Sequence, residues 1–160
     1  MNTGVVLAML GAAVAAVFAG IGSAGGVQVA GKASAGVCAE KPELFGKLLV
    51  LQALPGTQGI YGFLVAVLIM VQTGVISGNP ADLTIAQGWS FFISGVPVGI
   101  VGLFSGFYQG RTAAASIHMT GKDPETLAKG ITMTALVETY AILALLVSIL
   151  AVFGVSALSI

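Results

Sequence analysis

Charge is scarce in this sequence. Its 160 residues include six Lys or Arg and six Asp or Glu, so that 8% of the chain is charged and 57% is apolar. A soluble domain carries about 25% charged residues, and so few charges cannot cover the surface of a water-soluble globule. The composition predicts an integral membrane protein surrounded by lipid. The net charge of zero offers no basic surface for nucleic acid.

Cysteine and histidine are almost absent. A single cysteine, Cys38, excludes a disulfide framework within the chain. The one histidine, His118, is remote from it in sequence, so we interpret Cys38 as an incidental thiol in a short polar loop. The chain also has no phosphate-binding loop pattern. We therefore expect neither nucleotide binding nor catalysis by this chain itself.

Long apolar runs are plentiful, and a membrane span needs about 20 such residues. The runs are continuous rather than alternating, and backbone groups in lipid must be paired internally, so we predict helices. The first run has no preceding Lys or Arg and continues well past Gly20, which favours a retained span over a signal peptide. The predicted fold is an all-α membrane protein with four transmembrane helices, over residues 4–30, 48–73, 85–110 and 130–158.

Three connections remain, over residues 34–45, 77–84 and 119–127. The basic residues flank the first and third connections and avoid the second connection and both ends of the chain. The positive-inside rule therefore places loops 34–45 and 119–127 in the cytoplasm and the two termini outside. The basic residues are Lys32, Lys41, Lys47, Arg111, Lys122 and Lys129.

The two halves of the chain resemble each other at an offset of 82 residues. Pro-Glu at 42–43 recurs at 124–125, and the lysine at 47 recurs at 129. Chance explains matches between apolar residues, but polar residues are too rare here for it to explain these. We predict a duplicated helical hairpin, with one hairpin in residues 1–78 and the other in 79–160. Further matches pair Ser23 with Ser105 and Thr57 with Thr139, whereas Glu138 aligns with Gly56.

Glycine is concentrated in the first and third predicted helices. In the third helix, glycines recur every four residues, at 95 and 99 and again at 102, 106 and 110. Small residues at this spacing let another helix backbone approach closely. We expect these two helices to line the crowded inside of a ring, with the bulkier second and fourth helices outside them.

Glu138 is the only acidic residue inside a predicted span. It follows Lys129 by nine residues, roughly 14 Å along a helix, which places it near the middle of a hydrocarbon core about 30 Å thick. An ionised carboxylate there costs at least about 2.5 kcal/mol. Glu138 must therefore be protonated, paired or bound to a cation. The two readings are a structural hydrogen-bond donor and a transport site, and the second is the usual role of such a residue.

Other polar side chains are expected at similar depth. Thr57 and Tyr61 are four residues apart on one helix face, beside Gln58, and Gln109 lies late in the third helix. A proton site needs only the carboxylate, whereas these additional hard oxygens suit Na⁺. Arg111 follows Gln109 by two residues and would lie deep, where it either snorkels or faces a lipid-free inner surface.

Pro55 interrupts the second predicted helix. Proline has no N–H and strains the preceding turn. It frees the carbonyl of Leu51 and distorts the turn that carries the carbonyl of Leu54. Either oxygen is a candidate cation ligand from the residues alone.

Three segments carry a resemblance to a known family: LPGTQGIYG at 54–62, SGFYQG at 105–110 and LVETYAIL at 136–143. They resemble the duplicated proteolipid, or K subunit, of sodium-pumping bacterial V-type ATPases, over nearly the whole chain. The resemblance implies a homo-oligomeric ring in which each copy binds Na⁺. The implied ligands are Glu138, Gln58, Gln109, Thr57 and the carbonyl of Leu54, with the hydroxyl of Tyr61 steadying the glutamate.

The resemblance also implies partners and a mechanism. The ring would lie in the plasma membrane of a bacterium, turn with central-stalk subunits and carry Na⁺ past a static membrane subunit, whose arginine displaces the ion. A proton-carrying ring is the alternative, and relatives of the proton type usually lack the Thr-Gln pair. A passive channel predicts a continuous polar lining, where this sequence has one polar cluster. A structural membrane scaffold would tolerate Glu138→Gln.

Overall fold

The protein is described by a computed structural model covering residues 2–157. Every regular element in that range is helical, which confirms the predicted all-α class. Four segments are long and apolar enough to cross a membrane: 3–40, 42–72, 85–122 and 124–155. The elements are α1 (Thr3–Glu40), η1 (Pro42–Leu44), α2 (Phe45–Ala53), η2 (Leu54–Gly56), α3 (Thr57–Gln72), α4 (Ile85–Lys122), η3 (Pro124–Thr126) and α5 (Leu127–Ala157).

The helices are longer than the predicted spans. Helices α1 and α4 each have 38 residues, or about 57 Å at 1.5 Å per residue, nearly twice the thickness of the hydrocarbon core. Hydropathy marks only the part of a helix that suits lipid. Pro97 lies within α4 without ending it, and the next prolines after the two long helices are Pro42 and Pro124. The position of the predicted end of the fourth span, Leu158, lies outside the described residues.

The prediction of loops at two of the connections is therefore wrong. Most of 34–45 and 119–127 is helical, and only Lys41 and Asp123 separate the long helices from the 3₁₀ turns that follow. Cys38 lies half-buried in α1 rather than in a polar loop. The connection between the hairpins runs from 73 to 84, wider than the predicted 77–84. It contains the predicted domain boundary at residue 78, which stays a prediction.

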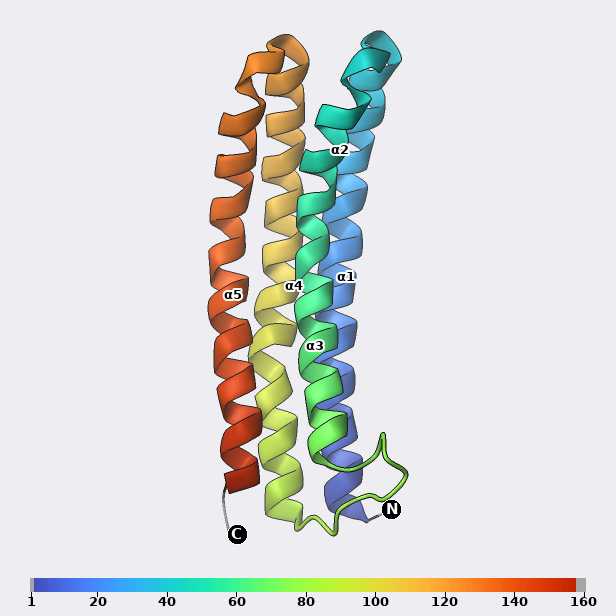
Figure 1. Cartoon of the computed structure of the whole chain (residues 1–160), viewed down its shortest axis with the longest axis vertical. Helices are drawn as coiled ribbons and strands as arrows, with labels where there is room; N and C mark the ends of the chain where they lie inside the picture. The colour runs from blue at the N-terminus through green and yellow to red at the C-terminus, as the bar shows by residue number, and fades with distance from the viewer. Residues whose placement is uncertain (1, 158–160) are drawn as a thin grey trace.

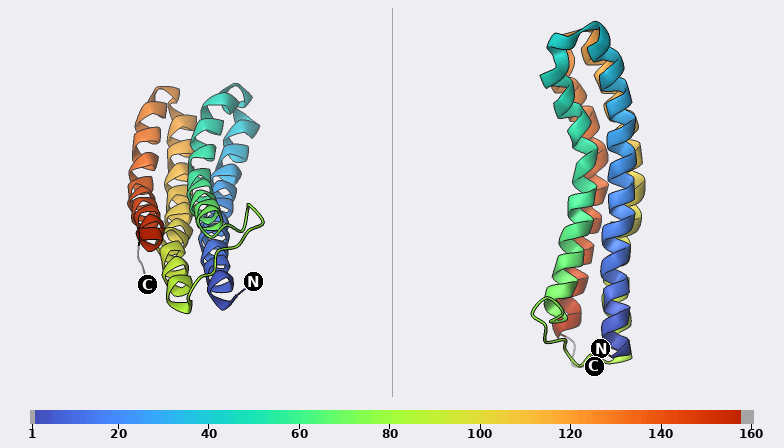
Figure 2. Two further views of the ribbon diagram at one scale, coloured as in Figure 1. Left: turned by 60° about the horizontal axis from the view of Figure 1, so that its bottom comes forward. Right: turned by 90° about the vertical axis from the view of Figure 1, so that its right-hand side faces the viewer.

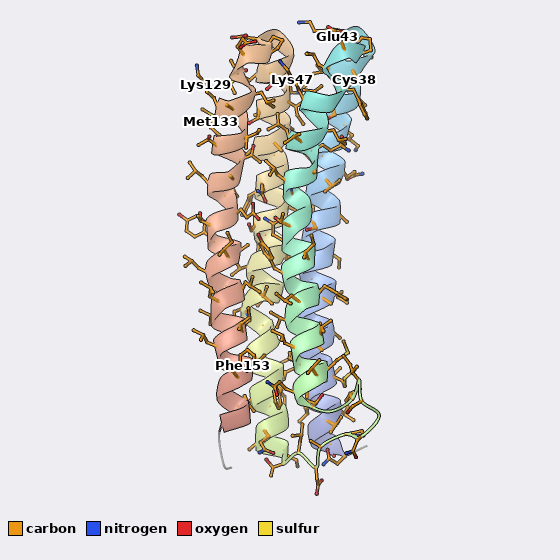
Figure 3. All side chains as sticks on the ribbon, in the orientation of Figure 1. Cys38, Glu43, Lys47, Lys129, Met133 and Phe153 are labelled. Atoms are coloured by element: carbon orange, nitrogen blue, oxygen red, sulfur yellow. The ribbon has the colours of Figure 1, made fainter. Side chains whose placement is uncertain are left out.

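The four rods form two layers. Helices α1 and α4 make one layer, and α2, α3 and α5 make the other (Figures 1 and 2). The short turns lie at one end of the bundle, together with the labelled lysines Lys47 and Lys129 (Figure 3). The long connection and the two ends of the chain lie at the other end. There Asn2 caps α1, accepting from the N–H of Val5, and its side chain donates to Asp82 at 2.6 Å.

Helices α1 and α4 touch backbone to backbone along a row of glycines. A Cβ atom added at Gly22 would lie 2.5 Å from the carbonyl oxygens of Gly102 and Leu103, so no larger residue fits without separating the helices. This confirms the predicted close packing through small residues. The paired glycines are Gly4 with Gly88, Gly11 with Gly95, Gly22 with Gly106, and Gly26 with Gly110.

Pro55 interrupts the second rod as predicted. The segment Leu54–Gly56 is a 3₁₀ turn between α2 and α3, because Pro55 has no N–H to continue the α-helical ladder. The backbone N–H of Thr57 closes the turn by donating to the carbonyl of Leu54. After the turn, Gln58 and Tyr61 of α3 form hydrogen bonds with residues of α4 and α5.

Candidate ion-binding site

The predicted polar side chains meet in the interior between three helices. Thr57, Gln58 and Tyr61 come from the first two turns of α3, Gln109 comes from α4 and Glu138 from α5. Hydrogen bonds connect all five within one chain, and Thr57 adds the carbonyl of Leu54. Whether the site needs a second subunit was open from the sequence, and one chain brings together all six predicted residues.

Glu138 is half-buried and accepts a hydrogen bond at each carboxylate oxygen. The hydroxyl of Tyr61 donates to Oε1, and the amide of Gln109 donates to Oε2 at 3.3 Å. Among the described residues, no Lys or Arg forms an ion pair with this carboxylate. Both hydrogen bonds to the carboxyl group thus come from neutral donors.

The two glutamines hold each other in place and are both fully buried. The amide nitrogen of Gln58 donates to Oε1 of Gln109 and to the hydroxyl of Ser105, the latter at 3.1 Å. The amide nitrogen of Gln109 also donates to the carbonyl of Thr134 at 3.2 Å. Buried amides carry a penalty unless they are paired, and here every N–H has a partner. The pairing fixes where the amide oxygens lie.

The oxygens around Thr57 are spaced as cation ligands are. Its Oγ1 lies 3.1 Å from the carbonyl oxygen of Leu54 and 3.5 Å from Oε1 of Gln58. Ca²⁺, a cation of nearly the radius of Na⁺, binds oxygen at about 2.3–2.6 Å, so two ligands at a right angle lie about 3.4 Å apart. Leu51, the other candidate, is fully buried in a hydrophobic cluster, whereas the carbonyl of Leu54 accepts from the hydroxyl of Thr57. The geometry favours Leu54.

The sequence did not predict the contacts of three further residues at the site. Ser105 accepts from Gln58 and donates to the carbonyl of Val137 at 3.2 Å, so it ties α3 to α5. Its counterpart in the first hairpin, Ser23, accepts from the backbone N–H of Gly59 at 2.7 Å. The carbonyl of Thr134 is the third. The match between the two serines was a signal in the sequence, but it gave no partner.

The first hairpin has the same framework without the facing carboxylate and amide. Gly56 stands where the second hairpin has Glu138. A Cβ atom at Gly56 would meet Cγ2 of Val27 at 3.8 Å, and Val27 is the counterpart of Gln109 at the offset of 82. The duplicated fold thus brings equivalent positions together in both hairpins. Only the second pair is a carboxylate and an amide.

Arg111 does not belong to the site. Residues two apart on a helix point to nearly opposite sides, so the fully buried Gln109 faces α3 and α5 while Arg111 is exposed on the other side of α4. Both expectations for this residue, snorkelling or facing an inner surface, stay predictions.

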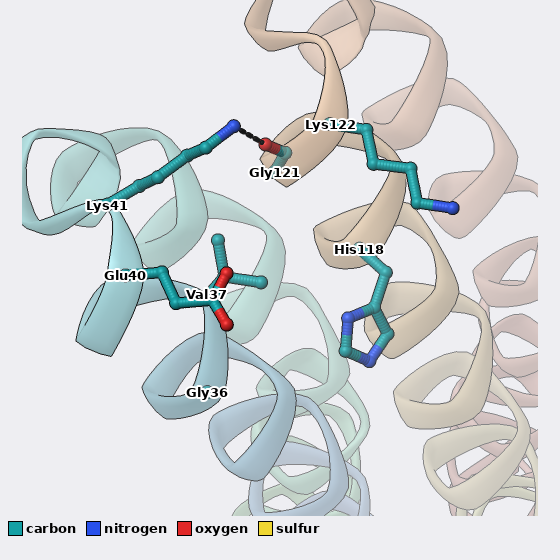
Figure 4. A pocket seen from close by; sticks show the side chains of 7 residues that line it. All are labelled: Gly36, Val37, Glu40, Lys41, His118, Gly121 and Lys122. Carbon is teal, nitrogen blue, oxygen red and sulfur yellow. Dashed lines mark hydrogen bonds between the residues drawn. The ribbon is translucent and has the colours of Figure 1, made fainter.

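A separate cavity of about 410 Å³ lies at the end of the bundle with the short turns (Figure 4). The ends of α1 and α4 form it, with Glu40, Lys41, His118 and Lys122 among its lining residues. Lys41 crosses the gap and donates to the carbonyl of Gly121 at 2.6 Å. This bond joins the turn of the first hairpin to the turn of the second, at the same end of the bundle.

The fold and the site together define a class of membrane protein: two parallel-running helical hairpins with one carboxylate among buried neutral oxygens. The family model for the C subunit of ATP synthase matches residues 10–69 and again residues 92–151. The two matches are displaced by 82 residues, the offset of the internal repeat. The chain belongs to this family in its duplicated form.

Three relatives show how the similarity is distributed. The V-type sodium ATPase subunit K of Enterococcus hirae is 47% identical, over 96% of this chain and 94% of that protein. The A-type ATP synthase subunit K of Methanocaldococcus jannaschii is 43% identical, over 89% of this chain and 61% of that protein. The 16 kDa proteolipid of the V-type proton ATPase of Nephrops norvegicus is 31% identical, over 88% of this chain and 86% of that protein.

Proposed function

We propose that this chain is the subunit of a membrane rotor ring in a V-type ATPase and that each copy carries one Na⁺ ion on Glu138. The observation that carries the proposal is the bonded group of oxygens around one carboxylate that has no basic partner within residues 2–157. Leu54, Thr57, Gln58, Gln109 and Glu138 supply the ligands. Tyr61 holds the carboxylate toward them.

The cost of a charge in lipid supplies the mechanism. An empty, ionised Glu138 resists passing through the bilayer, whereas a carboxylate that holds Na⁺ is neutral overall and passes. ATP hydrolysis by other subunits turns the ring past a static membrane subunit, which loads and unloads the ion. The chain's own part is to bind, neutralise and release the cation. It contributes no catalytic group.

The neutral oxygens favour Na⁺ over a proton as the ion that is carried. A proton needs one carboxylate oxygen, so the buried pair of glutamines and Thr57 would have no purpose in a proton carrier. Na⁺ needs several oxygens to replace its hydration shell. The 47% identical relative carries sodium in its name, which supports the same choice. A proton-carrying ring is the second candidate, because a 31% identical relative is named for protons.

The end of the bundle with the short turns is proposed to face the cytoplasm of a bacterial cell, with both chain termini outside. The six basic residues all lie at or toward that end in sequence, as the positive-inside rule requires. The charged rim around Glu40, Lys41 and Lys122 then faces the central-stalk subunits. The plasma membrane is the expected location.

Carbodiimide labelling tests the choice of ion. The reagent modifies a protonated carboxyl group, so bound Na⁺ should protect Glu138. We expect NaCl to suppress labelling of the purified protein at constant pH, while choline chloride at the same ionic strength does not. Glu138→Gln should remove the labelled site. Labelling that depends on pH but ignores Na⁺ would establish the proton carrier instead.

A further inference from the structure

The hydrogen bonds of the two buried glutamines have a fixed direction. An amide nitrogen can only donate, and an amide oxygen can only accept. The amide nitrogen of Gln58 donates to Oε1 of Gln109 and, at 3.1 Å, to the hydroxyl of Ser105. The amide nitrogen of Gln109 donates to Oε2 of Glu138 and to the carbonyl of Thr134. Each N–H group of the pair therefore has its own acceptor.

Two backbone carbonyls of α5 set this direction. A carbonyl can only accept, so Gln109 must turn its amide nitrogen toward the carbonyl of Thr134. The hydroxyl of Ser105 donates to the carbonyl of Val137 at 3.2 Å. Because a hydroxyl has one proton to donate, the oxygen of Ser105 can only accept from Gln58. The two carbonyls lie about one helical turn apart, and both impose the same orientation on the pair of glutamines.

This orientation decides which atom Gln58 presents to the proposed ion site. With its nitrogen toward Ser105, its Oε1 lies on the side of Thr57, 3.5 Å from the hydroxyl oxygen of that residue. The reversed amide would set Oε1 against a serine oxygen whose proton is already donated. It would also place N–H groups among the oxygens proposed to hold Na⁺, where a donor repels a cation. A buried amide with unpaired groups carries a penalty.

The internal repeat places a second serine beside the same glutamine. Ser23 is the counterpart of Ser105 at the offset of 82, and its hydroxyl accepts from the backbone N–H of Gly59 at 2.7 Å. Both serines are buried. Since Gly59 directly follows Gln58, α1 holds the main chain at this point and α4 holds the side chain. One position of the repeat thus contacts α3 from both hairpins, and only Ser105 contacts the amide.

We propose that Ser105 is a positioning residue of the ion site, which holds the amide of Gln58 with its oxygen toward the cation and thereby favours Na⁺ over a proton. Ser105 acts through Gln58 and supplies no ligand. A proton on Glu138 needs neither the amide oxygen nor its orientation. This inference rests on the proposed Na⁺ carrier and specifies how its selectivity is built.

Carbodiimide labelling of the purified, assembled protein tests the role. Ser105→Ala removes the hydroxyl, and we expect half protection of Glu138 to require about two- to tenfold more sodium, as for the loss of one ordinary hydrogen bond. Without sodium, the pH of half labelling should stay unchanged, because the hydrogen bonds to Glu138 come from Tyr61 and Gln109. Ser105→Thr keeps the hydroxyl and should restore protection.

A second background tests whether Ser105 acts through Gln58. In the Gln58→Ala variant there is no amide to orient. Adding Ser105→Ala to it should therefore change the sodium concentration for half protection no further, since two substitutions in one hydrogen-bonded pair are not additive. An equal loss in both backgrounds would mean that Ser105 affects the site independently of Gln58, and would overturn the positioning role.

Ser148→Ala is the matched control. Ser148 is fully buried between the same two helices, α4 and α5, and its hydroxyl accepts from the backbone N–H of Val98 at 3.2 Å. We expect both serine variants to melt at a lower temperature, and only Ser105→Ala to weaken protection by sodium.

Three results would contradict the positioning role and leave the Na⁺ carrier standing. They are unchanged protection in Ser105→Ala, an equal loss of protection in Ser148→Ala, and a shift in the pH of half labelling in Ser105→Ala without sodium. Labelling that ignores sodium in the unsubstituted protein would overturn the Na⁺ carrier and the positioning role together.

Discussion

The first and second hairpins share one backbone plan and divide the residues of the proposed ion site between them. The first supplies neutral oxygens through Thr57 and Gln58 on α3, and the second supplies the carboxylate Glu138 on α5. At the positions where the second hairpin has Glu138 and Gln109, the first has Gly56 and Val27. Two copies of a fold therefore make one complete site rather than two.

The difference shows what a site of this kind requires. Thr139 donates to the carbonyl of Leu136 at 2.5 Å, much as Thr57 donates to Leu54 at 3.1 Å. The hydroxyl and carbonyl pair is thus present in both hairpins, but Thr139 is exposed and no glutamine pair lies beside it. The local turn is duplicated, and the buried amides and carboxylate that make it a binding site are not.

The largest expected effect comes from moving the carboxylate between the hairpins. Glu138→Gln should abolish Na⁺ binding and Na⁺ transport by the assembled ATPase, because the remaining oxygens are neutral. Adding Gly56→Glu to this variant should not restore binding, since the new carboxylate meets the methyl groups of Val27 rather than an amide. Uptake of sodium into membrane vesicles measures both. Recovery of transport in the double variant would show that the hairpins are interchangeable.

A smaller effect is expected from making the second hairpin resemble the first at one position. Gln109→Val removes a donor to Glu138 and an acceptor for Gln58. A hydrogen bond to a charged group contributes about 1.5–3 kcal/mol, so we expect Na⁺ affinity to fall about ten- to a hundredfold. The sodium concentration that gives half protection from carbodiimide reports the change.

Val27→Gln is the control for that substitution. It places the same amide in the first hairpin, opposite Gly56, where no carboxylate accepts from it. Half protection should require an unchanged sodium concentration. An equal loss in both variants would indicate a general effect of polarity at this depth rather than a ligand role for Gln109.

The packing between the hairpins gives the next effect. Gly22→Ala places a methyl group 2.5 Å from backbone oxygens of α4, which cannot move without separating the helices. Overpacking of this kind costs about 1–3 kcal/mol. We expect a lower melting temperature of the purified protein. Gly36→Ala, on the same helix with nothing within 4 Å of the new methyl, should leave it unchanged, and equal losses would contradict the packing role.

The smallest effect separates two similar threonines. Thr57→Ala removes one neutral oxygen from the site, and loss of one ordinary interaction of about 0.5–1.5 kcal/mol weakens Na⁺ binding about two- to tenfold. Thr139→Ala removes the matching hydroxyl of the second hairpin, which is exposed and donates to the carbonyl of Leu136 instead of to a proposed ligand. Titration of Na⁺ by calorimetry compares the two. Similar affinities in both variants would exclude Thr57 as a ligand.

The sequence predicted which polar residues come together better than it predicted the helix ends. Glu138 is conspicuous because a carboxylate in a membrane span is costly, and the four-residue spacing of Thr57 and Tyr61 places them on one face. Helix ends past Ala30 and Gly110 were missed because hydropathy stops at the lipid boundary and the helices do not.

Contacts between helices were the other feature that the sequence could not predict. Leu54 could be chosen over Leu51 only through resemblance to a family, because the choice depends on how a 3₁₀ turn presents its carbonyls. Ser105 was visible as a repeat match, but a small residue in a glycine-rich helix has the same pattern whether it packs or donates. Its bond to Gln58 depends on how α3 packs against α4, which no sequence pattern specifies.

The stoichiometry of bound sodium tests the central claim most directly. Equilibrium binding of radioactive sodium to the purified, assembled protein should saturate at one ion per chain, and Glu138→Gln should reduce it to zero. Saturation at two ions per chain would mean that both hairpins bind. Saturating binding that survives Glu138→Gln would place the site elsewhere and contradict the account.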